Sequence, residues 1–266
     1  MSTQQELIAR VRAKCAADEG LDAALMYGSF AAGEADEHSD IEFWLFFTPE
    51  RRAAIEPASW CADIAPISHG LVNEFGTYVA FFPGLVRGEF HFVTTEEIAA
   101  VADWPARGAA VDRMVVVDRR GALTPVLSAL PRRYQTPDGH EAIARCCDPF
   151  VNWLVLAHHL TARGEFLRAW DALGHLQRHL VWMARLAENA TEHWLTPSRG
   201  AEVELSAEIV AQLRAATAEA MPEGLARALR AAFELGRRCW SVLADRYGTP
   251  LPTALFAELD AALGKE

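Results

Sequence analysis

One segment of the sequence combines a turn suited to phosphate with a pair of acids. Gly28 and Ser29 follow the apolar run 23–27. A Gly-Ser turn can bind phosphate oxygens through backbone N–H groups and the serine hydroxyl, since glycine permits a tight turn and close backbone approach. Asp40 and Glu42 stand at the start of the apolar run 41–47. Residues i and i+2 of a strand point to the same face, so the two carboxylates are expected side by side.

Two adjacent carboxylates repel each other unless a cation lies between them. Mg²⁺ suits such a pair, because it binds one or two carboxylates together with substrate phosphates. The turn and the acidic pair therefore indicate a nucleotidyl-transfer site, where metal ions clamp a triphosphate as pyrophosphate leaves. The alternative is a solvent-facing acidic pair at a strand edge. Gly28 and Gly33 also have P-loop spacing, but Glu34 stands where a P-loop requires lysine, which excludes a P-loop NTPase.

A third acid is expected from the segment RGEFHF at 87–92. Glu89 and His91 share one strand face, whereas Phe90 and Phe92 share the other and are expected in the core. Glu89 could be a metal ligand or the general base that takes a proton from a substrate hydroxyl. An ordinary edge-strand glutamate is the alternative. His91 is expected either to contact substrate or to fill the strand face, and Trp44 to belong to the core.

These side chains need a sheet to position them, and the first half of the sequence predicts one. Runs typical of strands lie at 23–27, 41–47, 78–82, 89–93 and 114–117, with a helix over 3–18 and another starting at 94–97. After residue 135 the apolar residues follow helical spacing, in segments beginning near 138, 166, 206, 223 and 252. Pro149 is expected to kink the first of these helices or to cap a fresh start. We therefore predict an α+β domain with a mixed sheet and flanking helices over 1–133, and an all-α helical bundle over 134–266.

Charge and composition limit the partners. The formal net charge is −11, which argues against nucleic-acid binding, because that needs basic surface. No apolar run approaches the ~20 residues that span a bilayer, and the start of the chain lacks the apolar region of a signal peptide. A cytoplasmic protein with small-molecule partners and no membrane partner is expected. The five cysteines form no C-x-x-C pair, so they are expected to be reduced thiols in the core.

With these motifs the chain resembles the DNA polymerase β-type nucleotidyltransferase superfamily and, more closely, the lincosamide nucleotidyltransferases. The stretches that carry the resemblance are MYGSFAAGEADEHSDIEFW (26–44), APISHGLVNEFGTYVAFF (65–82), RGEFHF (87–92) and RGEFLRAWDALGHLQR (163–178). The resemblance runs over the full length. It implies Mg²⁺-dependent transfer of AMP from ATP to a hydroxyl of lincomycin or clindamycin, which inactivates the drug and releases pyrophosphate. It also favours a homodimer.

The resemblance implies a role for each matching residue. Asp40 and Glu42 would be metal ligands, with two Mg²⁺ ions expected, and Glu89 would be the third acid and the base. Gly28 and Ser29 would bind the phosphates of ATP.

Two further residues are candidates on their own chemistry. His91 is the candidate for substrate binding. Arg163, where one predicted helix ends and the next begins, is a candidate for nucleotide binding across an interdomain cleft. The helix dipole by itself also favours an arginine at that position.

Three rival functions stay open. The same reaction could act on an aminoglycoside or another hydroxylated small molecule, since a charge of −11 suits a polycationic drug at least as well. The chain could instead be a non-catalytic nucleotidyltransferase-fold module. It could also transfer AMP to a protein hydroxyl.

Overall fold

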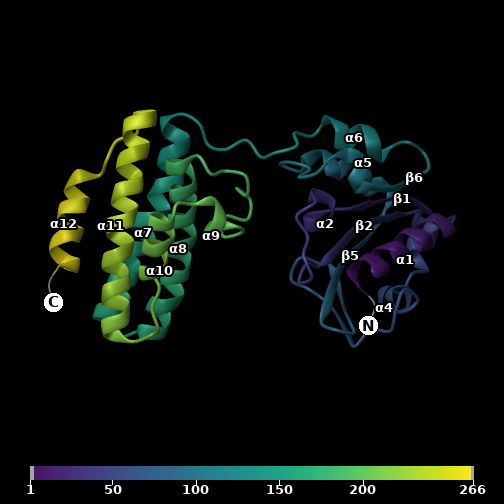
Figure 1. The fold of residues 1–266 in the computed structure, drawn as a ribbon, viewed down its shortest axis with the longest axis horizontal. Helices are drawn as coiled ribbons and strands as arrows, with labels where there is room; N and C mark the ends of the chain where they lie inside the picture. Colours follow the sequence, from purple (N-terminus) through teal and green to yellow (C-terminus); the bar gives the residue numbers. More distant parts are fainter. Residues whose placement is uncertain (1–2, 265–266) are drawn as a thin grey trace. The chain divides into compact units, whose positions relative to one another are not determined.

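The computed structural model describes residues 3–264, which form two compact units divided between Tyr134 and Gln135 (Figure 1). The first unit holds a six-stranded sheet with helices, and the second is helical throughout. The expected fold class, a mixed α+β region followed by a helical one, is confirmed. In the described part of the chain, no helix is long and apolar enough to span a membrane.

The sheet has the strand order β3-β4-β5-β2-β1-β6. Its strands are β1 (Leu21–Met26), β2 (Ile41–Phe47), β3 (His69–Val72), β4 (Tyr78–Phe82), β5 (Val86–Thr94) and β6 (Val115–Asp118). The pair β2–β5 is parallel, and the other neighbouring pairs are antiparallel. The sheet is therefore mixed, as predicted, and its parallel pair joins the two segments that carry the predicted acids.

The helices of the first unit cover and connect this sheet. They are α1 (Gln4–Ala17), α2 (Gly28–Ala32), α3 (Pro49–Ala53), α4 (Pro57–Ala62), η1 (Thr95–Asp103), α5 (Val111–Met114) and α6 (Leu123–Ala129). Thr3 and Glu6 form a capping box that starts α1. Thr94 and Glu97 form another at η1. The helix start predicted at 94–97 is therefore correct, but the helix is of the 3₁₀ type.

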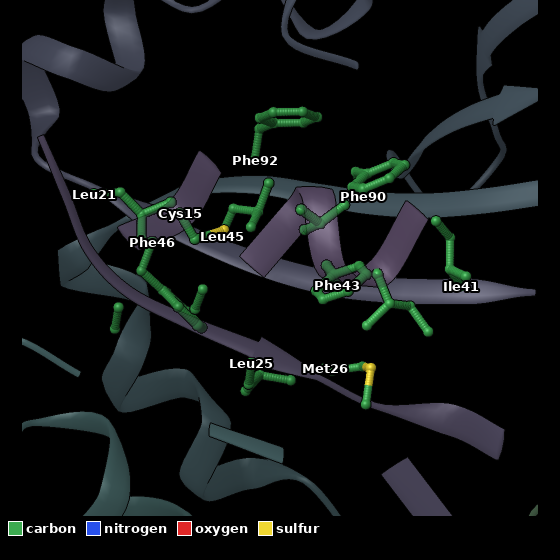
Figure 2. Packing of buried hydrophobic residues seen from close by; sticks show 14 of the residues in the cluster. Cys15, Leu21, Leu25, Met26, Ile41, Phe43, Leu45, Phe46, Phe90 and Phe92 are labelled. Atoms are coloured by element: carbon green, nitrogen blue, oxygen red, sulfur yellow. The ribbon is translucent and has the colours of Figure 1, made fainter. Parts of the chain in front are cut away.

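Alternation along β2 and β5 separates the core from the acids. Ile41, Phe43 and Phe90 are fully buried, and the rings of Phe43 and Phe90 stack with centroids 5.9 Å apart. Figure 2 shows these side chains with Leu25 and Met26 of β1 in one apolar cluster. Fully burying side chains of this size stabilises a fold by about 1.5–3 kcal/mol each. The apolar face thus anchors both strands, and the residues between project from the opposite face.

The second unit is a helical bundle formed by α7 (His140–Ala162), α8 (Phe166–Glu188), α9 (Ala201–Glu204), α10 (Ala207–Ala215), α11 (Pro222–Tyr247) and α12 (Thr253–Leu263). Helix α7 continues through Pro149, so no fresh helix begins there. The five cysteines are free, and all except Cys146 are buried, as the sequence predicts.

Candidate active site

The parallel pairing of β2 and β5 brings the predicted acids onto one face of the sheet. Glu42 and Glu89 are direct Cα partners in the ladder, and Trp44 and His91 are partners two residues further on. Asp40 lies one residue before β2 and is partly exposed. Since side chains alternate along both strands, these five residues share the face opposite Phe43 and Phe90.

The Gly-Ser turn adjoins this acidic face. Gly28 begins α2, with only Tyr27 between it and the end of β1, and has a φ of +69°, a conformation that favours glycine. A Cβ at Gly28 would lie 1.5 Å from Oε2 of Glu42, so the carboxylate occupies the space that any other residue would need. The backbone N–H of Tyr27 also donates to the carbonyl of Glu42 at 3.0 Å. The structure therefore brings Gly28 and Glu42 together, with Ser29 buried as the next residue.

Arg87 links two of the acids. Its Nη1 lies 2.5 Å from Oδ2 of Asp40, and its Nη2 donates to Oε1 of Glu89. Burial by itself lowers the pKa of Arg87, but the hydrogen bonds to the two carboxylates outweigh it, so its pKa is raised and the guanidinium stays charged. The sequence analysis missed Arg87, although its position two residues before Glu89 puts it on the same strand face.

Tyr27 holds the other oxygen of Glu89. Its hydroxyl donates to Oε2 of Glu89 at 3.2 Å and lies 3.1 Å from Nε2 of His91. Burial and the negative charges of Glu42 and Glu89 raise the pKa of Tyr27, so the phenol stays protonated as a donor. Tyr27 was missed as well, because the sequence did not indicate that the end of β1 would reach β5.

His91 is held between aromatic and hydroxyl groups. Its ring stacks on Trp44 with centroids 3.9 Å apart and an interplanar angle of 8°, and Oγ1 of Thr77 lies 3.3 Å from Nε2. Burial lowers the pKa of His91 to about 4, although the charge of Glu89 opposes this. The ring is therefore neutral at pH 7. Trp44, expected in the core, is partly buried and packs against it, and it also shares the strand face of His91.

Arg163 belongs to the helical unit, where it is the C-cap of α7. Its Nη1 lies 4.0 Å from Oε1 of Glu165, and its side chain is 64% exposed. The remaining sequence-predicted site residues all lie in the first unit. The assignment of Arg163 to the nucleotide stays a prediction.

The acidic face fits a divalent cation in its chemistry. Asp40, Glu42 and Glu89 supply the hard oxygen atoms that Mg²⁺ prefers, and the guanidinium of Arg87 already lies between two of them as a cation. Within residues 3–264, however, no three His, Cys, Asp or Glu side chains are grouped closely enough to hold a metal ion. A site that uses all three carboxylates at once would therefore require them to move closer together.

The second half of the chain is similar to a known protein family. Residues 139–261 match the family model described as "Lincosamide nucleotidyltransferase-like, C-terminal domain". This match confirms the resemblance stated from the sequence and the expectation of a nucleotidyltransferase. It spans just under half of the chain and does not include the strands that carry the acids.

Two solved structures are similar to the chain over nearly all of its length. One is an aminoglycoside 6-adenyltransferase from Bacillus subtilis, with 12% identity, a TM-score of 0.47, and coverage of 100% of both chains. The other is a nucleotidyltransferase-like protein from Exiguobacterium sibiricum 255-15, with 12% identity, a TM-score of 0.38, and coverage of 98% of this chain and 88% of that one. Among curated protein sequences, none matches this chain.

Proposed function

We propose that the protein transfers AMP from ATP to a hydroxyl of a lincosamide antibiotic, releases pyrophosphate and thereby inactivates the drug. One observation carries the proposal: the parallel pairing that sets Glu42 opposite Glu89, beside the Gly28 turn. The chain that carries this arrangement ends in a lincosamide nucleotidyltransferase-like domain, which supports the lincosamide acceptor. We also propose that the protein forms a homodimer.

Each residue of the acidic face has a place in this reaction. The turn at Gly28 and Ser29 would bind the phosphates of ATP. Asp40, Glu42 and Glu89 would hold Mg²⁺, with two ions expected. When bound, Mg²⁺ neutralises the charge on the triphosphate and on the leaving pyrophosphate.

The chain's own groups would move the proton. As the acceptor oxygen forms its bond to the α-phosphorus, the bond from that phosphorus to the bridging oxygen breaks and pyrophosphate leaves. Glu89 would accept the hydroxyl proton as general base. Tyr27 holds one of its carboxylate oxygens by a hydrogen bond, which restricts the orientation of the base. The neutral ring of His91, on the same face, would contact the acceptor.

An aminoglycoside acceptor is the second candidate. The formal net charge of −11 favours a polycationic drug, because a negative surface attracts and steers cations.

The decisive experiment is mass spectrometry of the purified protein with MgATP and either clindamycin, lincomycin or a panel of aminoglycosides. A mass gain of one adenylyl group on a lincosamide, abolished by EDTA and by Asp40→Ala, is the expected result. Asp63→Asn, which removes a carboxylate paired with Lys14 on the surface, should leave the product unchanged. A mass gain of one adenylyl group on aminoglycosides alone would show that the reaction is correct but that the acceptor is an aminoglycoside. If the protein binds ATP but the mass of none of the drugs increases, the proposal is wrong.

A further inference from the structure

Arg87 occupies the same carboxylate oxygens that a metal ion would need. Its guanidinium reaches from β5 to Asp40, just before β2, and to Glu89 on its own strand. The side chains of Arg87 and Asp40 are each 35% exposed, and that of Glu89 is 19% exposed. The three charged groups are therefore partly shielded from water, where charge pairs interact more strongly than at an open surface.

A divalent cation and this guanidinium would compete for the same two carboxylate oxygens, Oδ2 of Asp40 and Oε1 of Glu89. An ion bound to Oδ2 of Asp40 or Oε1 of Glu89 would lie within a few ångströms of Nη1 or Nη2 of Arg87. Like charges at that distance repel strongly in a partly desolvated site. Metal binding at these oxygens therefore requires Arg87 to leave at least one of them.

We propose that Arg87 is a built-in counter-ion that competes with the divalent cation for Asp40 and Glu89 and is released toward the nucleotide phosphates. The proposal rests on the proposed function, because it takes the acidic face as the metal site. In the absence of nucleotide, Arg87 neutralises the two acids and keeps the affinity for metal low. With nucleotide present, the released guanidinium gains phosphate oxygens, which arginine binds through two parallel N–H groups.

Arg87 would couple the binding of the divalent cation to the binding of the nucleotide. Because nucleotide gives Arg87 a new partner, it lowers the cost of releasing the carboxylates, and metal then binds more tightly. Coupling between two binding sites is reciprocal, so metal must strengthen nucleotide binding through Arg87 to the same degree. Arg87 is thus a positioning residue that makes the site assemble with both ligands together.

The test is a titration of Mn²⁺, followed by the electron paramagnetic resonance of the free ion, on the wild type, R87Q and R52Q. Arg52 is the matched control: it lies in the same unit on α3 and donates to the backbone carbonyl of Phe92 at 2.8 Å. We expect R87Q to bind Mn²⁺ about tenfold more tightly than the wild type, since a neutral side chain no longer competes. R52Q, which removes the same charge from the unit, should bind Mn²⁺ as the wild type does.

Nucleotide binding gives the second readout. The affinity for α,β-methylene-ATP, measured by calorimetry at saturating Mn²⁺, should fall in R87Q and stay unchanged in R52Q. Opposite changes in metal and nucleotide affinity are not expected from mere loosening of the fold, which would weaken both. Equal Mn²⁺ affinity in the wild type and R87Q would overturn the role of Arg87 and leave the proposed transferase standing. No Mn²⁺ binding in either protein, with or without the nucleotide, would overturn the metal-dependent function itself.

A measurement on the wild type does not depend on the variant folding. In a ¹⁵N-labelled sample, an arginine Nε–Hε signal should shift when Mg²⁺ and α,β-methylene-ATP are added together, and return when EDTA removes the metal. If metal binds and no arginine Nε–Hε signal responds to it, Arg87 does not leave the carboxylates and the inference is wrong.

Discussion

The hydroxyl of Tyr27 donates a hydrogen bond to Oε2 of Glu89 at 3.2 Å. Tyr27 follows β1, and Glu89 lies on β5, with β2 between the two strands. The contact therefore crosses the strand that carries Glu42. Arg87 holds the other oxygen of Glu89, and Tyr27 would keep this carboxylate oriented once Arg87 is released. An orientation so closely controlled suits a group that must meet a substrate hydroxyl in a defined geometry.

Glu89→Gln removes the proposed base while keeping the size of the side chain. We expect kcat to fall by about 100-fold or more, because a positioned general base contributes roughly that factor. ATP binding, measured by calorimetry, should change much less. Glu50→Gln, an exposed position on α3, is the control for the loss of one negative charge. Unchanged turnover in Glu89→Gln would remove Glu89 from the mechanism.

Tyr27→Phe removes the hydrogen bond to Glu89 without removing the ring. A hydrogen bond to a charged group contributes about 1.5–3 kcal/mol, and we expect only part of this to be lost from the barrier, because β5 still places Glu89 opposite Glu42. We expect kcat to fall about three- to tenfold with little change in the KM for ATP. Tyr78→Phe, in β4, controls for the loss of a phenol hydroxyl from the same sheet. An increase in KM with kcat unchanged would show that Tyr27 binds substrate and does not position the base.

His91 provides a prediction of pH dependence in the metal-free protein. Burial lowers its pKa in the folded state to about 4, whereas an unfolded histidine titrates near 6.5. Between these values the unfolded chain binds the extra proton and the folded chain does not, so stability falls as the pH drops from about 6.5 to about 4. Urea unfolding across this range should show a shallower pH dependence for His91→Gln than for the wild type. Identical slopes would show that His91 is charged in the folded protein.

The sequence predicted correctly which residues share a strand face. It did not predict the contacts between strands that hold these side chains in position. Period-two alternation was enough to place Asp40 with Glu42, and Glu89 with His91, because side-chain direction along a strand is a local property. The position of β5 beside β2 is not local, since β3 and β4 intervene in the chain and then pair on the far side of β5. Tyr27 was missed for this reason, since its partner Glu89 lies 62 residues away in the sequence. The link from Arg87 to Asp40, which spans 47 residues, was missed for the same reason.

Two features of the fold show where sequence patterns have little information. The strand β3 was not predicted, because His69, Leu71 and Val72 are exposed and show no alternation of apolar and polar residues. Pro149 was expected either to kink its helix or to start a new one, and of these two the new start is wrong, because α7 continues through it. The cost of the missing N–H is a local penalty. The burial of Phe150 and Leu154 in the bundle favours the continuous helix.

Gly28→Ala tests the close approach of the turn to the acids. The added Cβ would lie 1.5 Å from Oε2 of Glu42, so the carboxylate must leave its position and we expect transfer activity to be lost. Gly121→Ala is a matched control: its φ of +67° resembles the +69° of Gly28, and an added Cβ would meet nothing within 4 Å. Both variants carry the backbone strain of about 1–2 kcal/mol. If Gly28→Ala retained as much activity as Gly121→Ala, the position of Glu42 would not matter for the reaction.

Gly236 determines how closely α7 and α11 approach in the helical bundle. A Cβ at this position would lie 2.1 Å from the ring of Phe150, and overpacking of this kind costs about 1–3 kcal/mol. Gly174 on α8 is the matched control, since an added Cβ there meets nothing within 4 Å and alanine favours a helix over glycine by about 1 kcal/mol. Urea unfolding should therefore show Gly236→Ala destabilised and Gly174→Ala stabilised. A gain in stability for both would mean that Phe150 moves aside freely and that α7 and α11 are not tightly packed at this point.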